Sequence, residues 1–290
     1  MGQGNSNLEL HNDWWKEQTI VERLFTEFKQ YILGLLLSAS SSRSQYEFFT
    51  GFLFWHRDHL FWMTAGHVID RIENFLRDKK NKLIIRWFDF YPDENAGSIP
   101  INLSSIRMKS WSTNNLDAGF IEIGFLEGLN LLHNNSIRSM DVQICMNIDN
   151  AQPEGYYLIG FPRMYNNYSE KPQSNNKILK SLGADYACIP VEKISIPNDD
   201  PNQEFFENPD AFYGQLLDRQ LAPNNYIDNI NYMSGSPIFS IERTQEDRLL
   251  YRLFGIQTKW LPMTRRICAE PTTKIVNKLN LWIDENYTNE

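Results

Sequence analysis

The sequence is poor in cysteine. Its three cysteines, at positions 145, 188 and 268, are widely spaced in a chain of 290 residues, and no two of them form a Cys-x-x-Cys pair. An odd number of distant cysteines favours neither a disulfide framework nor a zinc cage. This scarcity predicts a reducing, cytoplasmic compartment.

Long apolar runs are also missing. The longest, residues 31–37, is far below the roughly 20 apolar residues that span a bilayer, so it predicts a buried strand. The N-terminus has no basic region followed by an apolar stretch, and its Met-Gly-Gln-Gly-Asn-Ser start matches the N-myristoylation pattern only loosely. We expect neither a cleaved export signal nor a membrane anchor.

Positive charge is in short supply. Lys and Arg number 28 against 36 Asp and Glu, for a formal net charge of -8, and this balance repels phosphate backbones. The densest basic stretch, residues 77–82, reads as a solvated loop, so nucleic acid is not an expected partner. No phosphate-cradling GxxxxGK loop occurs, and His56 and His59 lack further ligands. We therefore expect no metal and no cofactor.

What the sequence does contain is a series of short β-rich runs from residue 31 onward, separated by Asn, Asp, Gly and Pro. This texture predicts an all-β, antiparallel sandwich or barrel. The expected strands cover residues 31–38, 47–55, 59–65, 82–90, 99–109, 117–124, 141–148, 155–161, 178–192, 236–243 and 249–258. The polar stretches 164–177 and 197–231 are expected to be surface loops, and amphipathic helices are expected at 13–30 and 272–286.

Three short segments carry the residue types that acyl transfer needs, in the order base, orienting acid, nucleophile. They are Thr64–His67, Leu116–Phe120 and Met233–Pro237. Taken singly, His67 would be a structural histidine, Asp117 a turn cap and the Ser-Gly-x-Pro turn a hairpin corner. Each segment, however, stands where a strand gives way to a turn that could aim its side chain into a cleft. The ordered set therefore points to a serine peptidase.

These segments resemble family motifs. Thr-Ala-Gly-His-Val at 64–68 resembles Thr-Ala-Ala-His-Cys, Asp-Ala-Gly-Phe-Ile at 117–121 resembles Asp-Ile-Ala-Leu-Leu, and Met-Ser-Gly-Ser-Pro at 233–237 resembles Asp-Ser-Gly-Gly-Pro. Gly-Phe-Pro at 160–162 is similar to a family turn, and residues 254–258 are similar to the strand beside bound substrate. The chain thus resembles a trypsin-like, chymotrypsin-fold serine peptidase of an intracellular, bacterial-type branch.

The resemblance implies two antiparallel six-stranded β-barrels with a cleft between them, plus N-terminal and C-terminal helices. It extends over residues 31–286 and divides the chain as follows: 1–30, an N-terminal helical extension; 31–150, the first barrel; 151–270, the second barrel; and 272–286, the C-terminal helix.

The resemblance also implies roles. Ser234 attacks a peptide carbonyl, His67 acts as general base and then acid, and Asp117 orients the imidazole. The backbone N–H groups of Tyr232 and Ser234 would hold the oxyanion, and the substrate would be a protein or peptide.

The substrate-binding positions follow by counting along the same motifs. Asp228 lies six residues before Ser234, where the trypsin subgroup carries the acid that selects Arg or Lys. Thr258 falls where a family serine steadies the triad aspartate. Trp260 falls where a glycine lines the pocket, so it could narrow or block that pocket.

Three departures from the family pattern matter. Val68 replaces a cysteine, so the disulfide of secreted members is absent, and Met233 replaces the aspartate that pairs with a newly cleaved N-terminus. Tyr232 replaces a glycine, and a positive φ there would cost about 1–2 kcal/mol. The hypothesis is an oxyanion hole that is malformed at rest and completed when substrate or a regulatory protein partner binds.

Two other function classes stay open. A catalytically inactive trypsin-like protein-binding module would explain Tyr232 and Trp260. An esterase or other acyl hydrolase would use the same triad and fail on peptides.

Overall fold

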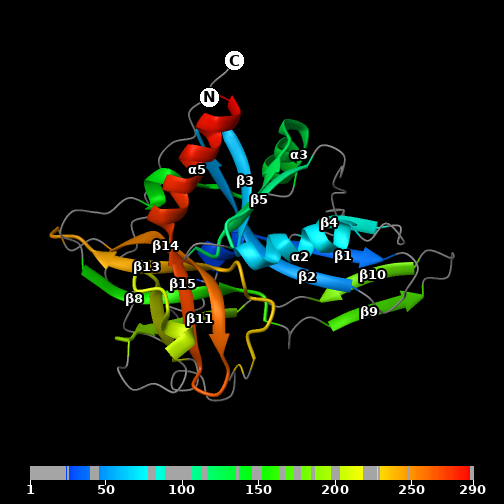
Figure 1. Ribbon diagram of the computed structural model, residues 1–290. Helices are drawn as coiled ribbons and strands as arrows, with labels where there is room; N and C mark the ends of the chain where they lie inside the picture. The colour runs from blue at the N-terminus through cyan, green and yellow to red at the C-terminus, as the bar shows by residue number, and fades with distance from the viewer. Residues whose placement is uncertain are drawn as a thin grey trace.

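Two β-rich lobes follow one another along the chain, with a helix running across both at the end (Figure 1). The computed structural model describes residues 24, 26–39, 46–77, 83–88, 106–112, 116–134, 137–145, 152–162, 167–172, 178–183, 187–196, 203–217, 227, 229–246 and 249–287. Within these ranges no helix is long and apolar enough to cross a membrane.

The first lobe is a seven-stranded sheet. Six strands follow one another in antiparallel order: β4 (Leu83–Phe88), β1 (Ile32–Ala39), β2 (Tyr46–His56), β3 (His59–Thr64), β6 (Gly119–Ile123) and β5 (Arg107–Ser110). The short β7 (Met140–Asp141) pairs with β2 in parallel.

Strand β3 shows why the strands of this sheet have apolar residues at nearly every position. Leu60 and Trp62 face a core inside the first lobe, whereas Phe61 and Met63 face the second lobe. Because successive side chains of a strand point to opposite faces, a sheet covered on both sides needs apolar residues at every position.

The second lobe is a closed six-stranded barrel. Its strands in spatial order are β11 (Ala187–Lys193), β12 (Phe212–Leu216), β15 (Arg266–Pro271), β14 (Leu249–Leu261), β13 (Pro237–Arg243) and β8 (Gln152–Gly160), and β8 closes the ring by pairing with β11. A separate two-stranded sheet, β9 (Asn167–Pro172) with β10 (Ile178–Gly183), lies in sequence between β8 and β11 of this barrel.

The expected all-β class with two lobes and a C-terminal helix is confirmed, and the second barrel has the expected six strands. In the first lobe no pairing joins the edge strands β4 and β5 among the described residues. The connection between these two strands, residues 89–105, lies outside those residues.

Several sequence expectations need correction. The run 59–65 continues into a helix that was not foreseen, α2 (Gly66–Arg77), although Val68, Ile69 and Ile72 have helical spacing and are buried. The short helix α3 (Phe125–Leu129), followed by a π-helical turn (Asn130–Asn134), was also missed.

Strand positions differ as well. The stretch 164–177 contains β9 and the stretch 197–231 contains β12, where loops were expected, because sheet pairing outweighs weak local preference. The run 178–192 is split between β10 and β11, and β15 was not predicted. Of the run 141–148, the described residues 141–145 form the end of β7 and a 3₁₀ turn (Val142–Cys145), and residues 146–148 lie outside the described part of the chain. A second 3₁₀ turn covers Gln203–Phe206.

Of the expected N-terminal helix, the structure describes helical residues at 24 and 26–28 and then a 3₁₀ turn (Lys29–Tyr31). Leu24 and Phe28 are buried, and the Phe28 ring stacks on Phe239 of the barrel at 4.1 Å between centroids. The remainder of 13–30 lies outside the described residues.

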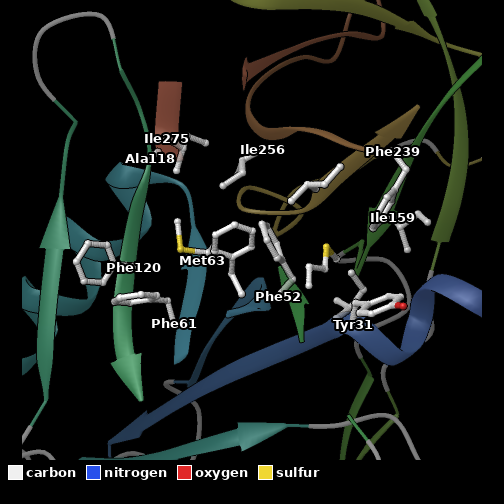
Figure 2. Packing of buried hydrophobic residues seen from close by; sticks show 14 of the residues in the cluster. Tyr31, Phe52, Phe61, Met63, Ala118, Phe120, Ile159, Phe239, Ile256 and Ile275 are labelled. Atoms are coloured by element: carbon white, nitrogen blue, oxygen red, sulfur yellow. The ribbon is translucent and has the colours of Figure 1, made fainter. Parts of the chain in front are cut away.

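One large apolar cluster joins the two lobes (Figure 2). Phe52, Phe61 and Met63 of the first lobe meet Phe239 and Ile256 of the second. Burial of aromatic side chains on this scale fixes the orientation of one lobe on the other, because each contributes about 1.5–3 kcal/mol when fully buried.

The C-terminal helix α5 (Thr272–Tyr287) confirms the expected helix and ties the lobes together (Figure 1). It leaves the barrel directly from β15, and three of its polar contacts lie on the first lobe. Asn280 Oδ1 is 2.7 Å from His56 Nε2, Asp284 pairs with Arg57 at 2.6 Å, and the Tyr287 hydroxyl donates to Glu122.

Candidate active site

His67 and Asp117 form a two-point hydrogen-bonded pair in the first lobe. The distance from His67 Nδ1 to Asp117 Oδ2 is 2.8 Å, and the backbone N–H of His67 donates to Asp117 Oδ1 at 2.9 Å. The Asp117 side chain is 20% exposed and that of His67 is 46% exposed. The carboxylate is thus half-buried while the imidazole reaches solvent.

Local sequence explains this geometry. His67 is the second residue of α2, so its main-chain N–H lies in the first helical turn, where an acceptor from outside the helix is needed. Asp117 supplies that acceptor. Gly66 permits the approach, since a Cβ there would lie 3.0 Å from Asp117 Oδ1 and 2.9 Å from the Ala118 carbonyl oxygen.

The pair also sets the tautomer of the imidazole. With Asp117 ionised, its oxygens only accept hydrogen bonds, so Nδ1 of His67 carries the ring proton. Nε2 then keeps a lone pair. Chemically, this arrangement makes His67 able to receive a proton on its outward side.

Ser234 lies in a tight turn that leads into β13. The N–H of Gly235 donates to the Gln257 carbonyl at 2.8 Å, and the N–H of Ser236 donates to the Met233 carbonyl at 2.8 Å. Gly235 adopts a φ of 94°, a conformation that glycine takes without steric penalty.

The first lobe packs directly against this turn. Thr50 Oγ1 donates to the Tyr232 carbonyl at 2.7 Å. A Cβ built on Gly235 would collide with Thr64 Oγ1 and with the Thr50 carbonyl. Thr64 is the last residue of β3, and α2 begins two residues later, so the serine turn packs beside the strand end that leads to His67.

The three predicted residues are therefore not equally connected. Among the described residues, the His67 ring is hydrogen-bonded to Asp117 and not to the Ser234 hydroxyl. Catalytic hydrogen bonds are often long in a protein without substrate and tighten when it binds.

Tyr232 has a φ of 76°, the positive value that its place in the turn demands. Its conformation costs about 1–2 kcal/mol relative to glycine. The hydrogen bond from Thr50 to its carbonyl helps to offset this strain.

The backbone donors around Ser234 differ from one another. Met233, Gly235 and Ser236 each donate to a main-chain carbonyl, whereas within the described part of the chain the N–H of Ser234 donates to none. A donor left available beside the nucleophile is what an oxyanion hole requires.

Met233 occupies the hydrophobic core of the barrel. It is fully buried and belongs to the same cluster as Ile230 and Ile238. The residue before the serine is thus held by apolar packing.

The three expected substrate-binding residues have different surroundings. Asp228 lies outside the described residues. Thr258 is the extra residue of a β-bulge in β14, and its hydroxyl donates to the Cys268 carbonyl at 3.4 Å. Trp260 packs against the barrel core, and its Nε1 is buried with no acceptor among the described residues.

Two residues near the site were not anticipated from the sequence. Arg265 is buried and donates to the Ile227 carbonyl at 2.5 Å, and burial lowers the pKa of its guanidinium. Glu270, at the end of β15, accepts a hydrogen bond from the backbone N–H of Asp117. Neither stands in a motif: Glu270 is placed by the pairing of β15, and Arg265 lies in the turn between β14 and β15 with a φ of 55°.

Within the described ranges, no group of three or more His, Cys, Asp or Glu side chains could hold a metal ion.

No family model and no curated protein matches the sequence. Solved structures of similar shape include the active form of the Rv3671c protease from M. tuberculosis, with 10% identity, a TM-score of 0.45, and coverage of 91% of this chain and 86% of that chain. The thermostable serine protease AL20 from an extremophilic microorganism has 9% identity, a TM-score of 0.46, and coverage of 84% and 91%. The protease Anisep from Arthrobacter nicotinovorans has 13% identity, a TM-score of 0.42, and coverage of 83% and 90%.

Proposed function

We propose that this protein is a serine endopeptidase in which His67, Asp117 and Ser234 act as a catalytic triad. The observation that carries the proposal is the two-point bond between Asp117 and His67, which leaves Nε2 as a base. Further support comes from the packing of the serine turn against Thr50 and Thr64. Thr64 is only three residues before His67 in the sequence.

The reaction follows from these positions. Ser234 Oγ attacks the carbonyl carbon of the scissile peptide while His67 Nε2 takes the hydroxyl proton, and Asp117 stabilises the imidazolium. The N–H groups of Ser234 and Tyr232 hold the oxyanion. The imidazolium then gives its proton to the leaving nitrogen as the C–N bond breaks. Water hydrolyses the acyl-enzyme by the same steps in reverse.

A fluorophosphonate probe tests the nucleophile. We expect covalent labelling of Ser234 and cleavage of a denatured protein substrate, with both lost in Ser234→Ala. Ser169→Ala serves as the control, because that serine lies in the separate β9–β10 sheet. Labelling that persists in Ser234→Ala would contradict the proposal.

Latency is the finer part of the proposal. The strain at Tyr232 makes the active arrangement of the hole energetically expensive, so a substrate or a regulatory protein partner that binds this arrangement would stabilise it. The buried Met233 takes the place of an activating ion pair.

A truncation that tests a regulatory role for the N-terminal segment must keep the residues of this segment that belong to the hydrophobic core. Since Leu24 and Phe28 are buried between the lobes, the truncation should remove residues 1–23 only. Full activity of the truncated protein with no partner present would argue against control by this segment.

Substrate preference follows from the neighbourhood of residue 227. The Arg265 guanidinium donates to the carbonyl of Ile227, the residue before Asp228. If Asp228 lines the substrate pocket, the positive charge of Arg265 would repel an Arg or Lys side chain of the substrate. We expect a peptide library to show no preference for Arg or Lys before the scissile bond. A strong basic preference would instead assign the pocket to Asp228 alone.

The alternative is a catalytically inactive protein-binding module, favoured by the strained Tyr232 and by the large Trp260 against the barrel core. It predicts no fluorophosphonate labelling of the wild type. A cytoplasmic location is proposed from the free thiols of Cys188 and Cys268.

A further inference from the structure

Glu270 is a buried carboxylate at the boundary between the lobes. The residue is 4% exposed and belongs to β15 of the barrel. Asn208 Nδ2 lies 3.2 Å from each of its carboxylate oxygens, and the backbone N–H of Asp117 donates to it. A side chain of the second lobe therefore holds the main chain of the acid in the first lobe.

Keeping a carboxylate here is unfavourable in itself. Burial is the largest cause that raises the pKa of Glu270, and the nearby Asp117 carboxylate raises it further. The hydrogen bonds from Asn208 and from Asp117 N–H, and the charge of Lys274, act in the opposite direction. An apolar residue would fill the space without these opposing effects.

The charged and titratable groups around Glu270 come from four elements. They are Asp117 before β6, Lys274 on α5, Tyr213 on β12 and Cys268 on β15, with Asp210 paired to Lys274 at 2.9 Å.

Among the described residues, the Thr258 hydroxyl makes no hydrogen bond to Asp117. The hydroxyl donates to the Cys268 carbonyl, because the β-bulge at this position turns it toward β15. The polar contact from the barrel to the triad acid is made two residues further along β15, by Glu270.

We propose that Glu270 is a positioning residue for the triad. By accepting a hydrogen bond from the main chain of Asp117, Glu270 keeps both carboxylate oxygens of Asp117 bonded to His67. This inference rests on the proposed function. It gives Glu270 no contact with substrate. The proposal has two consequences. Loss of the hydrogen bond between Glu270 and the main chain of Asp117 lets Asp117 shift, and loss of the negative charge of Glu270 makes the His67 imidazolium less stable.

Two substitutions separate these consequences. Glu270→Ala removes the acceptor, and we expect kcat to fall about 10–100-fold with KM changed less than about twofold, since a small misplacement of a catalytic group has an effect of this size. Glu270→Gln keeps an acceptor oxygen and removes the charge. We expect kcat within about threefold of the wild type and an acid limb of kcat/KM moved by about half a pH unit to lower pH.

The matched control is Glu207→Gln, the same chemical change at an exposed carboxyl near Asn208, which should leave the rate and the pH profile unchanged. Circular dichroism at each pH shows whether the variants are folded. A role in packing alone would lower stability in both Glu270 variants and leave the acid limb of Glu270→Gln in place, which would overturn the proposal.

The design distinguishes this inference from the proposed function. If the wild type neither labels with fluorophosphonate nor cleaves, the peptidase proposal fails, and the NMR titration of the His67 ring still tests the inference. That titration should occur at lower pH in Glu270→Gln than in the wild type. An active wild type with unchanged kinetics in both variants, or an unchanged His67 titration, would overturn the role of Glu270 only.

Discussion

The two halves of the candidate site are built differently. The histidine and acid half has ordinary backbone conformations and two short hydrogen bonds between His67 and Asp117. The serine half contains Tyr232 at a φ of 76° and Gly235 at a φ of 94°, and its turn is held from the other lobe by Thr50.

The difference teaches where control of the site would act. A strained turn that depends on contacts across the lobe interface responds to anything that shifts one lobe on the other. A hydrogen-bonded pair anchored in one sheet does not. We therefore expect the serine half to be the regulated one.

The largest effect should come from the histidine and acid half. Asp117→Asn lets the side-chain amide donate to the ring, so His67 takes the wrong tautomer and kcat should fall by about 10⁴. Steady-state kinetics on a peptide substrate measures it. Asp284→Asn, in an exposed pair with Arg57, should leave kcat unchanged. A fall of less than tenfold in Asp117→Asn would remove Asp117 from the triad.

Gly235→Ala should have the largest effect on stability. Its Cβ would collide with Thr64 and Thr50, and its φ would be strained, so unfolding in denaturant should show a loss of about 3 kcal/mol. Gly124→Ala is the control, because a Cβ there meets nothing closer than 3.8 Å. Equal stability of the two variants would mean that the turn is not wedged against the first lobe.

Thr50→Val tests the hydrogen bond that crosses the interface to the Tyr232 carbonyl. Leaving that carbonyl without its donor should lower the free energy of unfolding by about 1–2 kcal/mol and kcat by about tenfold. Thr272→Val removes a comparable buried hydrogen bond, to the Leu253 carbonyl, and should reduce stability alone. If both variants keep full kcat, the contact from Thr50 has no role in the serine half.

The smallest effect on stability is expected for Tyr232→Gly. Relief of the strain, about 1–2 kcal/mol, is partly offset by the greater freedom of glycine in the unfolded chain, so stability should rise by less than about 1 kcal/mol. Under the latency proposal, basal kcat should rise as well. Tyr232→Ala removes the ring and keeps the strain, so it should not gain stability. Equal basal rates in wild type and Tyr232→Gly would count against latency.

Much of the fold was predictable from local sequence. The runs that became β1, β2, β3 and β13 alternate or fill both faces with apolar residues, and α5 carries helical spacing. Strands β9 and β12 were not predicted because polar, Pro- and Asn-rich sequence has a weak local preference, and strand pairing decides its conformation. Strand β9 pairs with the neighbouring β10, whereas β12 pairs with β11 and with the distant β15.

The site was predictable in part. The order of the segments around His67, Asp117 and Ser234 indicated which side chains to compare, and their catalytic roles stay predictions. Nothing in the sequence indicated Glu270 or Arg265, since the partners of both, Asp117 and Ile227, are distant in the sequence.

The amino-acid sequence by itself determined the kinds of side chain available and the short segments that carry them, because strand alternation, helix spacing and small residues beside a turn are local properties. Tertiary structure alone decided that Thr50 would hold Tyr232 and that Glu270 would hold Asp117. These contacts join residues more than 100 positions apart in the sequence, so they exist only once the apolar cluster between the lobes has brought the two sheets together.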